Sequence, residues 1–304
     1  MTVLAFDAQP FSPSGETGPQ RRIATPPATP PVFPGTPMER ALDPQVLIGM
    51  PQLTPFGLSE SWLMKELGHR HWLLLARRLG MADADFRTPD GAAAYAAICA
   101  TALKGADLGA VAANDVLSIR SDLRPLSRAQ AASRHRLTLR GRPVGEVELV
   151  SAFVQRVGGG DNHALARVGL PGQDVRAAPE ENALAATASA LRHGRAPRHL
   201  ELLAQGDTGK TFAFTPDPVE DFNGAGLFYF AGFQALAGRA VRRWFPDTAG
   251  RAVRRRDVFF AGNIRPGETV GVTCTDRRDD GVACRLARPD GQVIGRVFTL
   301  FAPA

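Results

Sequence analysis

The stretch DFNGAGLFYFAGFQALAGRAVRRWF, residues 221–245, predicts a polar, glycine-rich turn that leads into a long helix. The first turns of this helix are apolar on nearly every side, which is typical of a buried helix. Its second half is amphipathic, because three arginines share one helical face: Arg239, Arg242 and Arg243. Segments with strand alternation follow Pro246, so we expect a sheet that wraps around this one helix.

A similar arrangement occurs earlier in the chain. VLIGMPQL (46–53) predicts a strand, TPFG (54–57) a turn, and the residues from Leu58 to about Gly80 a helix with leucines along one face. In this comparison Gly57 occupies the place in its turn that Gly224 holds in the second copy. The two helices are therefore predicted to be equivalent.

An internal repeat supports this equivalence. DVLSIRSDLRP (115–125) aligns with DVFFAGNIRP (257–266) through a one-residue gap, and alternating strands follow each copy. Two copies of helix and strands indicate a duplication that packs as a pseudo-two-fold pair. The alanine- and glycine-rich residues 83–114 are interpreted as an insertion, part of it helical, that has no counterpart after the second helix.

These patterns predict a domain organisation in four parts. Residues 1–43 hold nine of the 24 prolines and are expected to form a disordered, proline-rich tail. Two domains, 44–156 and 197–304, are joined by a linker, 157–196, in which Glu181–Gly194 predicts a short helix. The tail is either an extension without a role or a docking segment for a partner.

Three segments carry a resemblance to known proteins. DFNGAGLFYF resembles the active-site turn of hot-dog acyl-thioester enzymes. GMPQLTPFGLSESWLMKELGHRHW (49–72) and VFFAGNIRPGE (258–268) resemble the double hot-dog family typified by the leinamycin-pathway acyltransferase/decarboxylase. The resemblance implies an α+β fold of two tandem hot-dog halves, each a long helix wrapped by an antiparallel sheet.

The same resemblance implies a function. It predicts an enzyme of a polyketide-like biosynthetic pathway that transfers an acyl group from acyl-coenzyme A to an acyl carrier protein, with or without decarboxylation. No bound cofactor is expected, since the coenzyme A or phosphopantetheine thioester is itself the substrate. The family's self-acylating tyrosine does not carry over, because neither Tyr95 nor Tyr229 lies in the GLSE segment, where Trp62 stands. The alternatives are a hot-dog thioesterase and a non-catalytic module that binds an acyl chain or a carrier protein.

Asp221 is the leading catalytic candidate, because acyl-thioester chemistry needs a carboxylate or amide near the thioester carbonyl and N–H donors at a helix N-terminus. Asn223 adds an amide that can donate to a carbonyl oxygen. Ser59 and Glu60 are the corresponding catalytic candidates in the first half. Each residue also has a local, structural interpretation. Asp221 and Ser59 are alternatively helix caps, Glu60 a favourable carboxylate in the first turn, and Asn223 part of an Asn-Gly turn.

Further residues are expected to contact the substrate. Glycines in the two turns allow the backbone to approach a ligand, and an imidazole titrates near neutrality. His71 is either a general acid/base or a hydrogen-bonded structural residue, and Tyr229 either pocket wall or core. The expected contacts are Gly57, Trp62, Gly224, Gly226, Tyr229, His71 and Asn263. The spacing of histidines and cysteines predicts no metal site.

Composition narrows the partners. The chain of 304 residues is 44% hydrophobic and 22% charged, as is typical of soluble globular proteins. A net charge of +6, carried mostly by arginine, favours anionic partners. Coenzyme A phosphates and an acidic carrier protein are such partners. Nucleic acid is also anionic, but the sequence contains no nucleic-acid-binding motif. We expect a cytoplasmic protein, because the sequence contains no membrane-spanning run and no signal peptide. It is expected to be either a monomer, in which the two halves form a pseudo-dimer, or a homodimer. Cys274 and Cys284 are predicted to face each other on neighbouring strands as small core residues.

Overall fold

A computed structural model describes residues 35–157, 161–170, 182–195 and 207–303. Residues 36–304 form one compact unit, and most of the proline-rich tail lies outside the described residues. The helices are α1 (Pro37–Ala41), α2 (Glu60–Arg78), α3 (Ala183–Arg192) and α5 (Phe230–Trp244). The first strands are β1 (Gln45–Leu47), β2 (Leu53–Thr54), β3 (Gly57–Leu58), β4 (Tyr95–Lys104), β5 (Val116–Pro125), β6 (Gln130–Leu139), β7 (Arg142–Arg156) and β8 (Leu165–Arg167). The later strands are β9 (Thr211–Phe214), β10 (Val253–Phe260), β11 (Val270–Arg278), β12 (Gly281–Ala287) and β13 (Val293–Phe301).

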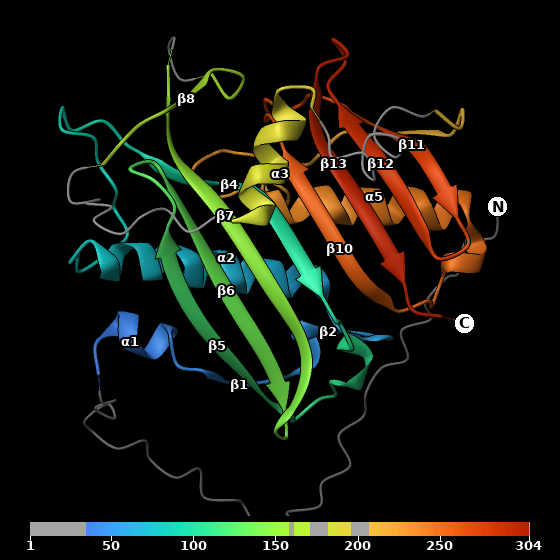
Figure 1. The fold of residues 1–304 in the computed structure, drawn as a ribbon, viewed down its shortest axis with the longest axis horizontal. Helices are drawn as coiled ribbons and strands as arrows, with labels where there is room; N and C mark the ends of the chain where they lie inside the picture. Colours follow the sequence, from blue (N-terminus) through green and yellow to red (C-terminus); the bar gives the residue numbers. More distant parts are fainter. Residues whose placement is uncertain (1–34, 158–160, 171–181, 196–206, 304) are drawn as a thin grey trace, which may run out of the picture. The chain divides into compact units, whose positions relative to one another are not determined.

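One antiparallel sheet organises the described residues. Its strand order is β1-β5-β6-β7-β4-β10-β13-β12-β11-β9, with β8 added beside β7. Counted inward from the two ends, β1-β5-β6-β7-β4 of one half corresponds to β9-β11-β12-β13-β10 of the other. The two halves meet where β4 pairs with β10. Helices α2 and α5 both lie against one face of this sheet, and α3 crosses the other face (Figure 1). The fold is therefore an α+β double hot-dog whose two sheets are continuous.

The position of β4 corrects two expectations. β4 and β10 occupy equivalent central places, each with a break in register, so the counterpart of β10 is β4 and not β5. The stretch 83–114 is therefore not an insertion without a counterpart, and the alignment of 115–125 with 257–266 pairs non-equivalent strands. Alanine is a poor strand former in isolation, but β4 is covered on both faces, and there small side chains fit the space that the packing leaves.

A small hairpin precedes each long helix. Leu53 pairs with Leu58 before α2, and Phe222 forms a bridge to Phe228 before α5. Each helix then starts two residues after the last paired residue of its hairpin, at Glu60 and at Phe230. These hairpins show which residues of the two turns correspond to each other.

The hairpins also correct the equivalence of the turns. The N–H of Ser59 donates to the carbonyl oxygen of Gln52 at 2.8 Å, and that of Tyr229 donates to the carbonyl oxygen of Asp221 at 3.0 Å. The counterpart of Asp221 is thus Gln52, and the counterpart of Ser59 is Tyr229. By the same count, Gly57 corresponds to Leu227 and not to Gly224.

The two long helices pack closely where they cross. A Cβ on Gly68 would lie 2.7 Å from Phe230 Cε1 and 2.9 Å from the Tyr229 hydroxyl oxygen, so only glycine allows this approach. Around this point the main core holds fully buried leucines and phenylalanines from both halves, for example Leu63, Leu67, Phe228 and Phe233. Burial of each such side chain contributes roughly 1.5–3 kcal/mol.

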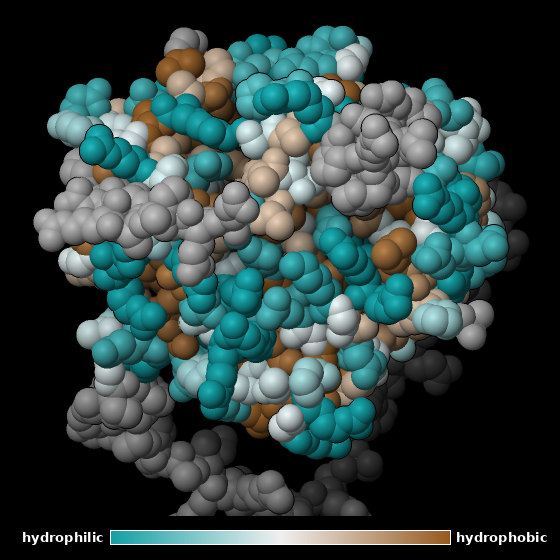
Figure 2. All heavy atoms as spheres, in the orientation of Figure 1, coloured by the Kyte–Doolittle hydropathy of each residue, from teal (hydrophilic) through white to brown (hydrophobic). Residues whose placement is uncertain are grey.

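The outer face of the sheet is covered by α3, the predicted linker helix. Leu184, Ala188 and Leu191, spaced four and three residues apart, pack on a second cluster that includes Ala100 and Phe259. Figure 2 shows this face of the molecule, where hydrophilic residues surround a paler, more apolar area. This helix therefore covers the seam between the two halves.

Other expectations can be compared directly with the structure. Cys274 and Cys284 are opposite each other on β11 and β12, buried and not bonded, as predicted. Helix α1 lies within the range expected to be tail, where Thr36 and Glu39 form a capping box. Across the described ranges, no helix combines the length and the hydropathy that a membrane span requires.

Candidate functional site

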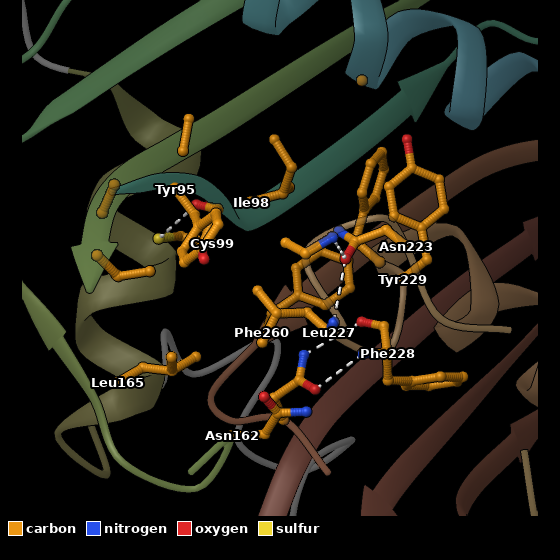
Figure 3. A pocket seen from close by; sticks show the side chains of 18 of the residues that line it. Tyr95, Ile98, Cys99, Asn162, Leu165, Asn223, Leu227, Phe228, Tyr229 and Phe260 are labelled. Atoms are coloured by element: carbon orange, nitrogen blue, oxygen red, sulfur yellow. Dashed lines mark hydrogen bonds between the residues drawn. The ribbon is translucent and has the colours of Figure 1, made fainter. Parts of the chain in front are cut away.

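A cavity of about 670 Å³ lies where the two halves meet. Helix α2, the start of β4 and the segment 161–167 line it from the first half and the linker. The turn 223–230, the start of α5 and the end of β10 line it from the second half. Figure 3 shows Tyr95, Cys99 and Leu165 on one side and Phe228, Tyr229 and Phe260 on the other.

Aromatic rings form much of the cavity wall. The first half contributes Trp72, Phe86 and Tyr95, and the second half contributes Phe228, Tyr229, Phe230, Phe233 and Phe260. Several of these rings pack edge to face, since the centroids of Phe233 and Phe260 are 4.9 Å apart at an interplanar angle of 86°. Such a wall offers an apolar surface of fixed shape.

The turn of the second half is held by two side chains of the first half and the linker. Asn162 is buried and donates from Nδ2 to the carbonyl oxygens of Gly226 at 2.7 Å and Ile264 at 2.8 Å. Its Oδ1 accepts from Arg156 Nε at 3.0 Å. Arg156 in turn donates to the carbonyl oxygen of Ala225 and to the Tyr95 hydroxyl. Together they form a clamp that positions the polar turn against the cavity.

Asn263 fixes the start of α5. Its Oδ1 accepts from the Phe228 N–H at 3.0 Å, and its Nδ2 donates to the Phe228 carbonyl oxygen at 3.1 Å. Oδ1 also accepts from the Ile264 N–H at 2.9 Å. Asn263 lines the cavity as expected, but its amide is occupied by the backbone, so its contribution is to position Phe228.

Asn223 also lines the cavity and has a free donor. Its Oδ1 accepts from the N–H groups of Ala225 at 3.1 Å and Leu227 at 3.0 Å, which builds the turn. Within the described ranges its Nδ2 has no hydrogen bond. This amide is thus available to a carbonyl oxygen in the cavity. Gly224 lines the cavity next to it, whereas Gly226, at φ +67°, lies outside the wall and accepts from Asn162.

Asp221, the leading catalytic candidate, does not line the cavity. Its carboxylate accepts from the N–H of Asp217 at 2.8 Å and so closes the preceding turn. Gln52, its counterpart, does the same in the first half, where Oε1 accepts from the Gly49 N–H at 2.8 Å. The shared position indicates a local structural role for both side chains.

The candidates of the first half lie together at the start of α2, away from this cavity. Ser59 caps the helix by accepting from the Trp62 N–H, and Glu60 forms an ion pair with Arg256 at 3.2 Å. Gly57 has φ +103°, and a Cβ there would lie 2.3 Å from a carbonyl oxygen. Its conformation and packing therefore require glycine without any ligand.

His71 is not a cavity residue. It is completely buried, with Nδ1 2.7 Å from Ser133 Oγ and Nε2 2.7 Å from Ser151 Oγ. Ser133 also bonds to the buried His135. Burial lowers the pKa of His71 to about 3, so this ring stays neutral. The expected contact between His71 and the substrate is therefore wrong. The alternative, a hydrogen-bonded structural histidine, describes its environment.

A cavity histidine that pairs with a carboxylate was not identified from the sequence. His163 Nε2 lies 2.7 Å from Glu268 Oε2, and His163 lines the cavity. Burial opposes ionisation of Glu268, but hydrogen bonds from the Arg265 N–H and from His163 outweigh it and lower the pKa of Glu268. The carboxylate is thus ionised and orients the imidazole. Sequence reasoning missed the pair because His163 lies in the linker, 105 residues from Glu268.

Two other cavity groups are poor nucleophiles. Burial, with a smaller contribution from Glu66, raises the pKa of Tyr229 to about 12. Burial also raises the pKa of the Cys99 thiol, although Arg192 and Arg167 partly offset this. Neither residue is ionised near neutral pH. In the part of the chain that the structure describes, no group of three or more histidine, cysteine or acidic side chains is placed to hold a metal ion.

Comparisons with known proteins agree with this fold. No model of a protein family matches the chain, and no sequence among the curated proteins does. An acyl-ACP thioesterase from Bacteroides thetaiotaomicron superposes with a TM-score of 0.61 at 12% identity, over 87% of this chain and 99% of that one. The 12:0-ACP thioesterase from Umbellularia californica superposes with a TM-score of 0.57 at 9% identity, over 86% of this chain and 96% of that one. At these identities the likeness concerns the fold.

Proposed function

We propose that this protein binds an acyl thioester in the cavity and hydrolyses it. The observation that carries the proposal is an apolar cavity with two polar groups on its wall, His163, which pairs with Glu268, and the free amide of Asn223. Acyl chains need an apolar enclosure, and thioester cleavage needs a base and a donor to the carbonyl oxygen. The solved structures named acyl-ACP thioesterases share this fold and support the proposal.

The roles follow from the hydrogen bonds. With Nε2–H donating to Glu268, the Nδ1 of His163 carries the lone pair, and within the described ranges this atom has no hydrogen bond. Nδ1 takes a proton from water as the water oxygen attacks the thioester carbon. The carbonyl oxygen becomes an oxyanion that accepts from Asn223 Nδ2. The carbon–sulfur bond then breaks, the proton passes to the sulfur, and a carboxylic acid and a free thiol leave.

Acyl transfer to an acyl carrier protein uses the same cavity and differs in its acceptor, the carrier thiol in place of water. The raised pKa of Tyr229 argues against a self-acylated tyrosine there, and with it against decarboxylation by that route. Hydrolysis is the simpler proposal because it needs no second protein. A module without catalysis is the remaining alternative, and it predicts binding without turnover.

The test measures thiol release from a panel of acyl-coenzyme A substrates. His163→Gln and Glu268→Gln should each lower kcat/KM, the histidine change by about 10²-fold or more. Asn223→Asp keeps the Oδ1 acceptor of the turn and removes the donor, and it should lower kcat with little change in the melting temperature. His193→Gln, at an exposed histidine of the linker helix end, is the matched control.

Four outcomes separate the alternatives. Free acid that appears with or without a carrier protein supports hydrolysis. Acyl groups that appear on the carrier, detected as a mass shift, show a transferase. Wild-type rates in His163→Gln would overturn the proposed base, and binding without any thiol release would overturn the hydrolase.

A further inference from the structure

The composition of the cavity wall differs from that of the core around it. Eight of its side chains are aromatic, among them both tyrosines of the chain, while its branched aliphatic residues are Ile98, Val154, Leu165 and Leu227. The main core is otherwise rich in leucine, isoleucine and valine, and four of its five phenylalanines, Phe228, Phe230, Phe233 and Phe260, belong to this wall. A cavity that accepts a flexible alkyl chain needs no aromatic wall, so this difference requires its own explanation.

The rings of the second half form a continuous series, edge to face except for the tilted pair of Phe228 and Phe233. Phe260 is its centre: its centroid is 6.1 Å from that of Phe230 at 89° and 4.9 Å from that of Phe233 at 86°. Tyr229 extends the series from Phe230 at 4.9 Å, and Phe228 extends it from Phe233 at 5.0 Å. Because each ring is held by its neighbours, this part of the wall has a fixed shape.

The first half adds both rings and small residues to the wall. Trp72, Phe86 and Tyr95 line the cavity from this half, and the centroids of Trp72 and Phe86 are 5.9 Å apart at an interplanar angle of 70°. Alanines at and just before the start of β4 lie beside them. Both halves thus contribute rings that neighbouring rings hold in place, and such a wall suits a planar, rigid group.

Two physical effects favour a ring over an alkyl chain of equal carbon number in this cavity. Aromatic pairs gain stabilisation beyond the area that they bury, and a ring has few rotatable bonds to immobilise. An alkyl chain gains only the apolar area and must be ordered at each of its bonds. We propose that the acyl group carried by the substrate of this protein is aromatic, with its ring bound against Phe260; this rests on the proposed acyl-thioester function.

The experiment compares substrates of equal carbon number. Phenylacetyl-coenzyme A, cyclohexylacetyl-coenzyme A and octanoyl-coenzyme A each carry eight acyl carbons and differ in planarity and flexibility. We expect kcat/KM for the phenylacetyl substrate to exceed that for octanoyl by about tenfold, with cyclohexylacetyl between them. Equal values, or a preference for octanoyl, would overturn the proposal.

Variants test the assigned ring within the same protein. Phe260→Leu keeps an apolar side chain and removes the ring, so it should reduce the phenylacetyl-to-octanoyl ratio several-fold. Phe298→Leu is the matched control, because Phe298 is equally buried on the outer face and pairs with Phe259 away from the cavity. The ratio is insensitive to a general loss of folded protein. An unchanged ratio in Phe260→Leu would contradict the assignment.

A binding measurement separates this inference from the proposed function. Calorimetry with the non-hydrolysable thioethers S-(2-phenylethyl)-coenzyme A and S-octyl-coenzyme A needs no turnover. Tighter binding of the phenyl compound without hydrolysis of any thioester would keep the inference and defeat the hydrolase. Hydrolysis without a preference for the ring would keep the hydrolase and defeat the inference. Binding of neither compound, with no hydrolysis, would defeat both.

Discussion

Asn162→Ala tests the clamp that joins the two halves at the cavity. The change removes two bonds from Nδ2 to main-chain carbonyl oxygens, at 2.7 and 2.8 Å, and one bond that Oδ1 accepts from Arg156 at 3.0 Å. Each hydrogen bond contributes about 1 kcal/mol, and buried carbonyl oxygens left without a donor add to the loss. We therefore expect the free energy of unfolding to fall by about 3 kcal/mol.

The stability assay is urea denaturation, analysed as a two-state transition. The corresponding fall in melting temperature is about 5 °C, because the entropy of unfolding of a unit of this size is roughly 0.6 kcal/mol/K. Because the clamp positions the turn that carries Asn223, thioester hydrolysis should also fall in Asn162→Ala at temperatures where the variant is folded. Gln45→Ala is the control, since it removes an amide from an exposed surface position and should cost less than about 0.5 kcal/mol.

The reasoning also predicts the behaviour of a near-isosteric variant. Asn162→Asp keeps the acceptor for Arg156 but places a carboxylate oxygen against two carbonyl oxygens, so it should destabilise the protein despite its matched shape. A loss below about 1 kcal/mol in Asn162→Ala would refute the view that this residue joins the halves. Wild-type hydrolysis in the folded variant would refute its effect on the turn.

Three further predictions follow from other buried groups. Arg256→Ala should lower the free energy of unfolding by about 3–5 kcal/mol, because it leaves Glu60 as a partly buried, unpaired charge. The double change Glu60→Leu/Arg256→Met removes both charges and should therefore cost less. Urea denaturation that shows equal costs for the two variants would contradict this. Burial depresses the pKa of His71 and His135 to about 3, below the value near 6.5 of an unfolded chain, so the unfolded state binds more protons between these values. Stability should therefore be complete above about pH 6.5 and fall by up to about 1.4 kcal/mol per pH unit for each histidine as the pH drops toward 3; a flat profile in urea denaturation between pH 7 and pH 4 would be the opposing result. Gly57→Ala should lower the melting temperature, since φ is +103° and the new Cβ would meet a carbonyl oxygen at 2.3 Å, whereas Gly141→Ala, which has open space around it, should show only the smaller backbone effect.

Local chemistry explains what could be predicted from the sequence. The apolar stripe and the cap at Ser59 predict α2, and the aromatic and alanine run after Tyr229 predicts α5. Strand alternation places Cys274 opposite Cys284, and the alanine-rich segment after Asn182 predicts α3. These patterns depend on neighbours within a few residues, which the sequence contains. Together with the motifs of the resemblance they were sufficient for the double hot-dog fold.

Tertiary structure decided the rest, because the deciding partners are distant in the chain. The alanine-rich residues of β4 predict a partly helical insertion when only their local propensity is considered. They form a strand because β7 and β10 pair with them on both sides, and the sequence of β4 does not contain those partners. Asp221 is close in sequence to residues of the cavity wall, yet its carboxylate accepts from the Asp217 N–H, just as the side-chain amide oxygen of its counterpart Gln52 accepts from the Gly49 N–H. His163 and Glu268 belong to segments that only the packing of the two halves brings within 2.7 Å of each other. Spacing along a chain cannot encode such a contact, so the candidate site became visible only in the folded molecule.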